Sequence, residues 1–170
     1  MPVTPTSSLA LAIDGLRQLV AESATFRTRV GAANQAEALE KVFVSDVEVS
    51  EEEGLIVGLR PFAIVFVIDS RYRHLGAGPQ HQAGGAIGLL LTDNAQFTGP
   101  DDAPEDSEID FWNFAGGAVD DIAFLLAGGG DRWPFIEPQL VDFGRNSWVE
   151  GENEDFWSAN YQFPYGLGRG

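Results

Sequence analysis

Two apolar runs separated by a glycine-rich stretch constrain the fold of this sequence more than any other feature. The first covers residues 61–69 (PFAIVFVID) and the second residues 83–91 (AGGAIGLLL). The first run is apolar at almost every position and rich in β-branched and aromatic residues, which is typical of a strand covered on both faces. The glycines of the second run leave room for a neighbouring backbone. We therefore expect two strands joined by a loop over residues 70–84.

The N-terminal part of the sequence carries two helix signals. Apolar residues spaced four, three and four apart predict a helix with one buried face after a cap at Ser7 or Ser8; they are Leu9, Ile13, Leu16 and Val20. Asn34 and Glu37 have the spacing of a capping box ahead of a second, short helix. This helix would lead into residues 42–49 (VFVSDVEV).

The second half of the sequence predicts one more helix and two more strands. Helical spacing relates Phe114, Ala118, Ile122 and Leu125, and three glycines at 128–130 would end that helix. Residues 134–144 alternate only in part, whereas residues 156–163 alternate well between apolar and polar positions. The fold class predicted from this order is α+β, a mostly antiparallel sheet with helices packed on one face.

Composition limits the classes of protein that this chain can belong to. With 170 residues, 44% of them hydrophobic, the sequence predicts a single domain over 1–170 behind a short unstructured lead at 1–7. Cysteine is absent, which excludes disulfides and thiolate sites. A net charge of -16 disfavours non-specific binding to DNA or to an anionic membrane surface. We expect a soluble, unsecreted protein whose partners are neutral, basic or cationic, and no apolar run is long enough to span a bilayer.

Acidic residues cluster in three blocks, which lie within residues 46–53, 101–110 and 150–155. All three blocks have the character of connections, and residues 92–110 are predicted to form one acidic connection. Solvated loops are the simplest interpretation. Mutual repulsion that delays self-association is a second. A cation site is a third, although the block at 101–110 lacks the ligand pattern of an EF-hand.

No motif in the sequence predicts catalysis or a cofactor. His74 and His81 stand seven residues apart beside Arg71 and Arg73, but zinc would need a third ligand, so exposed loop histidines are the favoured interpretation. The glycines at 76–85 do not open a helix, which argues against a dinucleotide fingerprint. No serine stands in a nucleophile elbow. We expect no metal, no cofactor and no enzymatic activity; a metal-dependent enzyme that uses the histidines is the remaining catalytic alternative.

Aromatic residues near the C-terminus leave a binding function open. They are Trp133, Trp148, Trp157, Tyr161 and Tyr165. Such side chains can line a sugar-binding groove, but they more often fill a core or a subunit contact. A small-ligand or carbohydrate-binding module is therefore the alternative function.

The order of the predicted elements, and the kind of residues in each, resemble the proteins of one known family. A leading helix is followed by LRPFAIVFVID, a long loop, AGGAIGLLLTD, the helix FAGGAVDDIAFLL and a closing pair that ends in WSANYQFPYG. From about residue 8 to 166 this resembles the tail terminator, or tail completion, proteins of long-tailed bacteriophages. The resemblance implies a structural virion protein of the tail and neck region, made in the host cytoplasm, whose six copies form a ring.

The same resemblance implies partners and an interface. A terminator ring caps the tail tube protein and joins the head-tail connector or stopper protein; a neighbouring neck protein has a similar shape. DNA would pass through the channel without specific recognition. The loops at 70–84 and 92–110 would then reach ring contacts or the channel, and the candidate interface residues are Arg71, Tyr72, Arg73, His74, His81, Asp101, Asp102 and Trp133.

Overall fold

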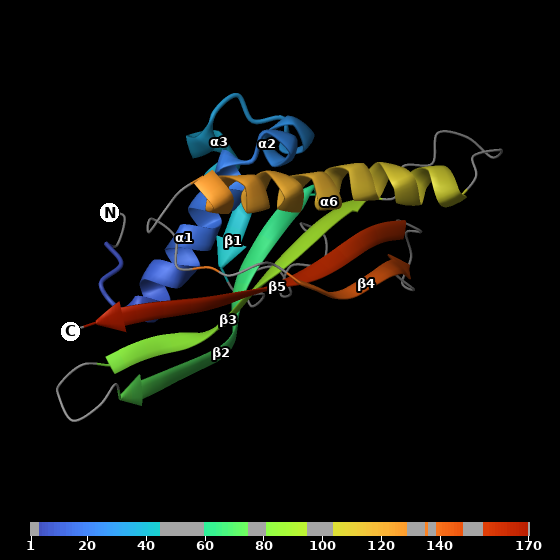
Figure 1. The fold of residues 1–170 in the computed structure, drawn as a ribbon. Coiled ribbons are helices and arrows are strands. Elements are labelled where there is room, and N and C mark those ends of the chain that lie inside the picture. Colours follow the sequence, from blue (N-terminus) through green and yellow to red (C-terminus); the bar gives the residue numbers. More distant parts are fainter. Residues whose placement is uncertain are drawn as a thin grey trace.

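The structure, a computed structural model, describes residues 4–44, 60–74, 81–94, 104–128, 135, 139–147 and 155–169. Helices lie on one face of a five-stranded sheet with the strand order β1-β2-β3-β5-β4 (Figure 1). Only β1 and β2 run parallel, and the other neighbouring strands are antiparallel. This arrangement confirms the predicted α+β fold class. Within the described ranges, no helix is long and apolar enough to cross a membrane.

The sheet is built around three long strands, β2 (Phe62–His74), β3 (His81–Asn94) and β5 (Asp155–Arg169). The loop predicted over residues 70–84 is wrong for most of its length, because β2 continues to His74 and β3 begins at His81. The glycines that suggested a loop serve the strand pairing instead. Gly85 has φ 159°, and a Cβ there would lie 2.1 Å from the Asp69 carbonyl oxygen, next to the register shift between Val67 and Asp69.

Two shorter strands form the edges of the sheet. One edge is β1 (Val42–Val44), which the sequence pattern did not predict. The other is β4 (Gln139–Ser147), which begins later than the predicted strand at 134–144, while Phe135 makes a separate bridge to Tyr165.

Three helices open the chain. Ser7 caps α1 (Ser8–Glu22), accepting a hydrogen bond from the Ala10 amide at 3.1 Å. The short helix α3 (Gln35–Leu39) has the predicted cap: Asn34 Oδ1 accepts from the Glu37 amide at 3.1 Å, and the Glu37 carboxylate accepts from the Ala33 amide at 2.8 Å. Between them lies α2 (Ala24–Val30), which was not predicted because only its serine cap and Gly31 mark its seven residues.

The predicted acidic connection at 92–110 is wrong at both of its ends, and the long helix α6 (Pro104–Gly128) begins within it. β3 reaches Asn94, and residues 104–110 are already helical. Acidic side chains in the first turns of a helix interact favourably with its N-terminal partial charge, so an acidic run can be a helix start as well as a loop. Tertiary contacts hold this start in place, because Ser107 is buried and its hydroxyl accepts a hydrogen bond from Trp157 Nε1 at 2.9 Å.

The core lies between the helices and one face of the sheet. Residues of β5 alternate between the two faces of the sheet, as predicted. The apolar residues Trp157, Ala159, Tyr161 and Phe163 are all buried on the helix-covered face. Aromatic rings fill the space beneath the start of α6, where Phe143 stacks on Trp157 with their ring centroids 5.5 Å apart. The same face of β2 contributes Ala63 and Val65.

Candidate functional site

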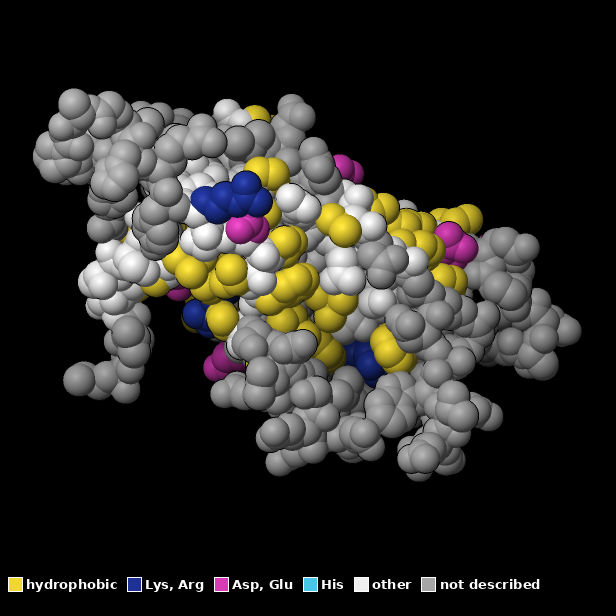
Figure 2. All heavy atoms as spheres, turned by 90° about the horizontal axis from the view of Figure 1, so that it is seen from below, with side chains coloured by type: hydrophobic (Ala, Val, Ile, Leu, Met, Phe, Trp, Pro, Cys, Tyr) yellow, Lys and Arg dark blue, Asp and Glu magenta, His cyan; other side chains and the backbone are white. Residues whose placement is uncertain are grey.

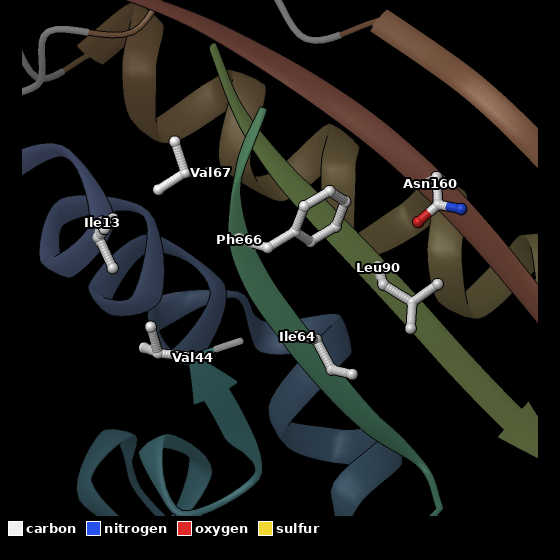
Figure 3. A pocket seen from close by; sticks show the side chains of 7 residues that line it. All are labelled: Ile13, Val44, Ile64, Phe66, Val67, Leu90 and Asn160. Atoms are coloured by element: carbon white, nitrogen blue, oxygen red, sulfur yellow. The ribbon is translucent and has the colours of Figure 1, made fainter. Parts of the chain in front are cut away.

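An apolar groove marks the sheet edge where β1 stops. Its volume is about 580 Å³, and its lining comes from four strands and α1 (Figure 3): Ile13, Val44, Ile64, Phe66, Val67, Leu90 and Asn160. The parallel pairing of β1 with β2 ends at Val44 and Val65, while β2 continues to His74. Among the described residues, no strand takes the place of β1 beside this second part of β2, so the groove stays open.

Both faces of β2 are apolar, which is why the groove is apolar too. Phe62, Ile64 and Phe66 alternate with the core residues and lie on the face opposite the helices. The Phe66 ring lies directly over Gly88 of β3, where a Cβ would come within 2.3 Å of the ring. Seen from the helix-free side, hydrophobic side chains gather over the middle of the molecule (Figure 2). The continuous apolar run in the sequence was the signal for this second apolar face.

Among the described residues, two pairs of consecutive aliphatic side chains are exposed, one on β2 and one on the edge strand β4. Val67 and Ile68 on β2 are each 45% exposed, and Leu140 and Val141 on β4 are 49% and 59% exposed. Both pairs stand at register shifts, between Val67 and Asp69 and between Leu140 and Asp142. A bulge turns a residue out of the regular alternation, so neighbouring apolar side chains can both reach the surface.

A cluster of one arginine and two carboxylates joins α2, β3 and α6. Arg29 Nε donates to Asp93 at 2.6 Å, and its Nη1 donates to Asp110 at 3.1 Å. The hydrogen bond to Asp110 raises the pKa of Arg29 against the opposing effect of burial. Burial raises the pKa of Asp93 more than its bond to Arg29 lowers it, because the Asp93 side chain is only 2% exposed. The cluster therefore connects α2 to β3 and α6 through ion pairs.

A second polar contact ties α2 to the middle of α6. Asp121 accepts hydrogen bonds from Ser23 Oγ at 2.8 Å and from the Thr25 amide at 2.9 Å. Burial would raise the pKa of Asp121, but these hydrogen bonds outweigh it and lower the pKa. Ser23 Oγ also accepts from the Phe26 amide, so one carboxylate supports the start of the helix.

The structure places most of the predicted interface residues at the end of the β2–β3 hairpin. Arg71 has an 83% exposed side chain and pairs with Asp69 at 2.8 Å. Tyr72, Arg73 and His74 end β2, and His74 stands directly opposite His81. Asp101, Asp102 and Trp133 lie outside the described residues. Sequence reasoning missed Arg169, which stands beside His81 on β5 and is 88 positions away in the sequence.

The aromatic residues proposed for sugar binding are core residues where the structure describes them. Trp157, Tyr161 and Tyr165 are 5%, 6% and 3% exposed. Burial raises the pKa of Tyr161 to about 12. Trp133 and Trp148 lie outside the described residues. Because the three described side chains are covered, they do not form a sugar-binding surface.

Neither a metal-binding cluster among the described residues nor a related protein indicates a chemical activity. Within the described ranges, no three His, Cys, Asp or Glu side chains are grouped so that they could hold a metal ion. Comparison with known proteins finds no family model and no curated protein that matches this chain. What the described residues offer is a set of apolar and charged surfaces suited to contacts with other molecules.

Proposed function

We propose that this protein is a structural subunit that assembles with copies of itself into a ring, as a tail terminator of a long-tailed bacteriophage does. In this role six copies would cap the tail tube and offer a surface to the head-tail connector or stopper protein. The protein would be made in the host cytoplasm and would reside in the neck region of the virion. Its role would be structural, without catalysis.

The observation that carries this proposal is the open apolar groove together with the exposed aliphatic pairs on β2 and β4. Exposed apolar surface that is not scattered singly commonly marks a protein contact. A closed ring needs two different patches on each subunit, one for each neighbour. Val67 and Ile68 on one side of the sheet, and Leu140 and Val141 on the other, supply such a pair of patches.

The element order and the charge agree with the proposal. The resemblance to tail terminators rests on a leading helix, two strands, a helix and a closing pair of strands, and the chain has these elements in this order. The net charge of -16 would keep subunits apart at low ionic strength and would limit the sticking of DNA to a channel wall. Assembly on a template would overcome this repulsion through many simultaneous contacts.

The test is assembly, measured by sedimentation velocity at low and high salt and by negative-stain imaging, with and without purified tail tubes. We expect six-fold rings, or single caps on tube ends. Val67→Glu should prevent assembly, because Val67 is 45% exposed in the groove, whereas Phe124→Glu on α6, where Phe124 is 80% exposed, should not. A stable two-fold dimer, or tubes that stay uncapped, would refute the terminator role.

The groove favours a second candidate, the binding of a small apolar ligand. Its volume of about 580 Å³ lies within the usual range of ligand sites. Its apolar lining suits an alkyl or aromatic compound better than a sugar. Titration with an environment-sensitive apolar dye would distinguish the candidates: saturable binding by a monomer, lost in Val67→Glu, would favour the ligand.

A further inference from the structure

Basic residues gather at one end of the long strands. Arg71, Arg73 and His74 end β2, His81 begins β3, and Arg169 ends β5. The pairing places His74, His81 and Arg169 side by side across three strands. Both histidines and three of the ten Lys and Arg residues of the chain therefore lie at this end, which is on the left in Figure 1. We call these five residues the basic end.

Acidic residues gather at the opposite end of the sheet. Glu105, Asp106, Glu108 and Asp110 lie in the first turns of α6, and Asp155 begins β5. The hydrogen bond from Trp157 to Ser107 holds these turns over the start of β5. We call these five residues the acidic end. Since β5 has 15 residues, the two ends are about 45 Å apart, at about 3.3 Å per residue.

Asp106 and Glu108 of the acidic end have no ion pair with any side chain that the structure describes. Arg29 donates to Asp93 and Asp110, and the Arg60 Cζ lies 3.8 Å from the centroid of the Phe156 ring. Asp106 is exposed, and Glu108 is partly exposed beside Ile109, which is 59% exposed. The acidic end thus offers carboxylates around an exposed aliphatic side chain.

We propose that the basic end of one copy docks on the acidic end of the next, head to tail. This inference rests on the proposed function, because it takes a second copy of the chain as the occupant. Two molecules with a net charge of -16 repel each other, and contact between the two ends brings opposite charges together. An exposed aliphatic residue also lies at or near each end: Ile109 on α6 within the acidic end, and Ile68 on β2 three positions before Arg71.

A second copy fits the basic end better than a nucleic acid does. The acidic surface required is present on the chain itself, whereas DNA would have to approach against the repulsion of the whole molecule. Contacts between two different surfaces also give the repeating geometry that a ring needs. Charged groups act mainly at contact, since the screening length is about 8 Å at physiological salt.

The test exchanges charges between the ends. One variant carries Arg71→Glu with Arg73→Glu, and the other carries Asp106→Arg with Glu108→Arg. Each alone should weaken self-association about tenfold or more in sedimentation equilibrium, because like charges then meet. An equimolar mixture of the two should associate again, because each altered end then finds a complementary partner. A matched control, Arg17→Glu with Arg27→Glu, makes the same net charge change on α1 and α2 and should have little effect.

Cross-linking provides a second readout on a chain without cysteine. Gln82→Cys marks the basic end, next to Arg73 in the pairing, and Ile109→Cys marks the acidic end. Mixing the two single variants with a short bis-maleimide should give a heterodimer, whereas neither variant alone should cross-link efficiently. The two positions are too far apart for a cross-link within one molecule.

The outcomes separate this inference from the ring proposal. Association unchanged by the charge exchange, or homodimers of Gln82→Cys alone, would overturn end-to-end docking and leave the ring possible. Charge-dependent dimers or filaments that never close would support the docking and refute the terminator role. Binding of a short DNA duplex that is lost in the Arg71→Glu, Arg73→Glu variant, with association unchanged, would assign the basic end to phosphates instead.

Discussion

At the scale of single residues, Gly88 leaves room for the ring of Phe66, which lines the groove. The Phe66 ring lies where a side chain at position 88 would be, since a Cβ there would come within 2.3 Å of it. Gly88→Ala should therefore displace the ring and destabilise the protein by about 1–3 kcal/mol. Gly116→Ala is the control, because its Cβ would lie 4.0 Å from Trp112 and alanine favours a helix by about 0.5–1 kcal/mol. Urea unfolding measures both, and equal stabilities would contradict the close contact.

The buried carboxylate of Asp93 gives a second prediction at this scale. Arg29→Ala should cost about 2 kcal/mol, less than the 3–5 typical of a fully buried pair, because Arg29 is 25% exposed. Burial raises the pKa of Asp93, so Asp93 takes up its proton at a higher pH in the folded state than in the unfolded chain. The cost should therefore shrink as the pH falls from neutral through that raised pKa. In an Asp93→Asn background, the effect of Arg29→Ala should lose the part of this pH dependence that Asp93 causes; urea unfolding at several pH values tests both statements.

At the scale of elements, the sequence predicted those features that depend on contacts between neighbouring residues. The caps of α1 and α3 and the alternation of β5 follow from neighbouring residues and were predictable. The start of α6 was not, because an acidic run suits a loop or a helix N-terminus equally, and its burial depends on Trp157, which lies 50 positions from Ser107. The extent of the β2–β3 hairpin was missed because glycines that allow close pairing, such as Gly85, resemble loop glycines.

The anchoring of α2 on α6 can be tested through Asp121. Asp121→Ala should destabilise the protein by about 1 kcal/mol and speed amide exchange at Thr25 and Phe26, because two hydrogen bonds at the start of α2 are lost. The pKa of Asp121 is lower in the folded state, so its contribution is present above the unfolded pKa and disappears as the pH falls through the folded one. Asp120→Ala, at an exposed neighbouring position, should change neither measurement.

At the scale of the whole molecule, the two proposed interaction surfaces depend on long-range strand pairing. The groove exists because β1 ends at Val44 while β2 continues, and the basic end exists because β5 brings Arg169 beside His81. Both arrangements depend on residues that are far apart in the sequence. The sequence therefore predicted Arg71, Arg73 and the two histidines as candidate residues, but it did not predict that Arg169 lies beside them. The charge of the whole chain, by contrast, was known from composition alone.

If copies dock end to end as proposed, the net repulsion between them and the attraction between their ends should respond to different ranges of salt. The screening length falls from about 30 Å at 0.01 M to about 10 Å at 0.1 M and about 3 Å at 1 M. Added salt first screens the repulsion between copies with a net charge of -16 and only later weakens charges in direct contact. Self-association, followed by sedimentation velocity, should therefore rise to a maximum near about 0.1–0.2 M salt and then fall.

Two variants test whether the decrease in self-association at high salt comes from contacts between the basic end and the acidic end. The quadruple variant that exchanges charges at both ends keeps the net charge of -16, so it should show the same maximum. The Arg71→Glu, Arg73→Glu variant has lost the attraction, so its weaker association should only increase with salt. A maximum that persists in this variant would mean that contacts elsewhere weaken at high salt, and the basic end would then have no part in joining the copies.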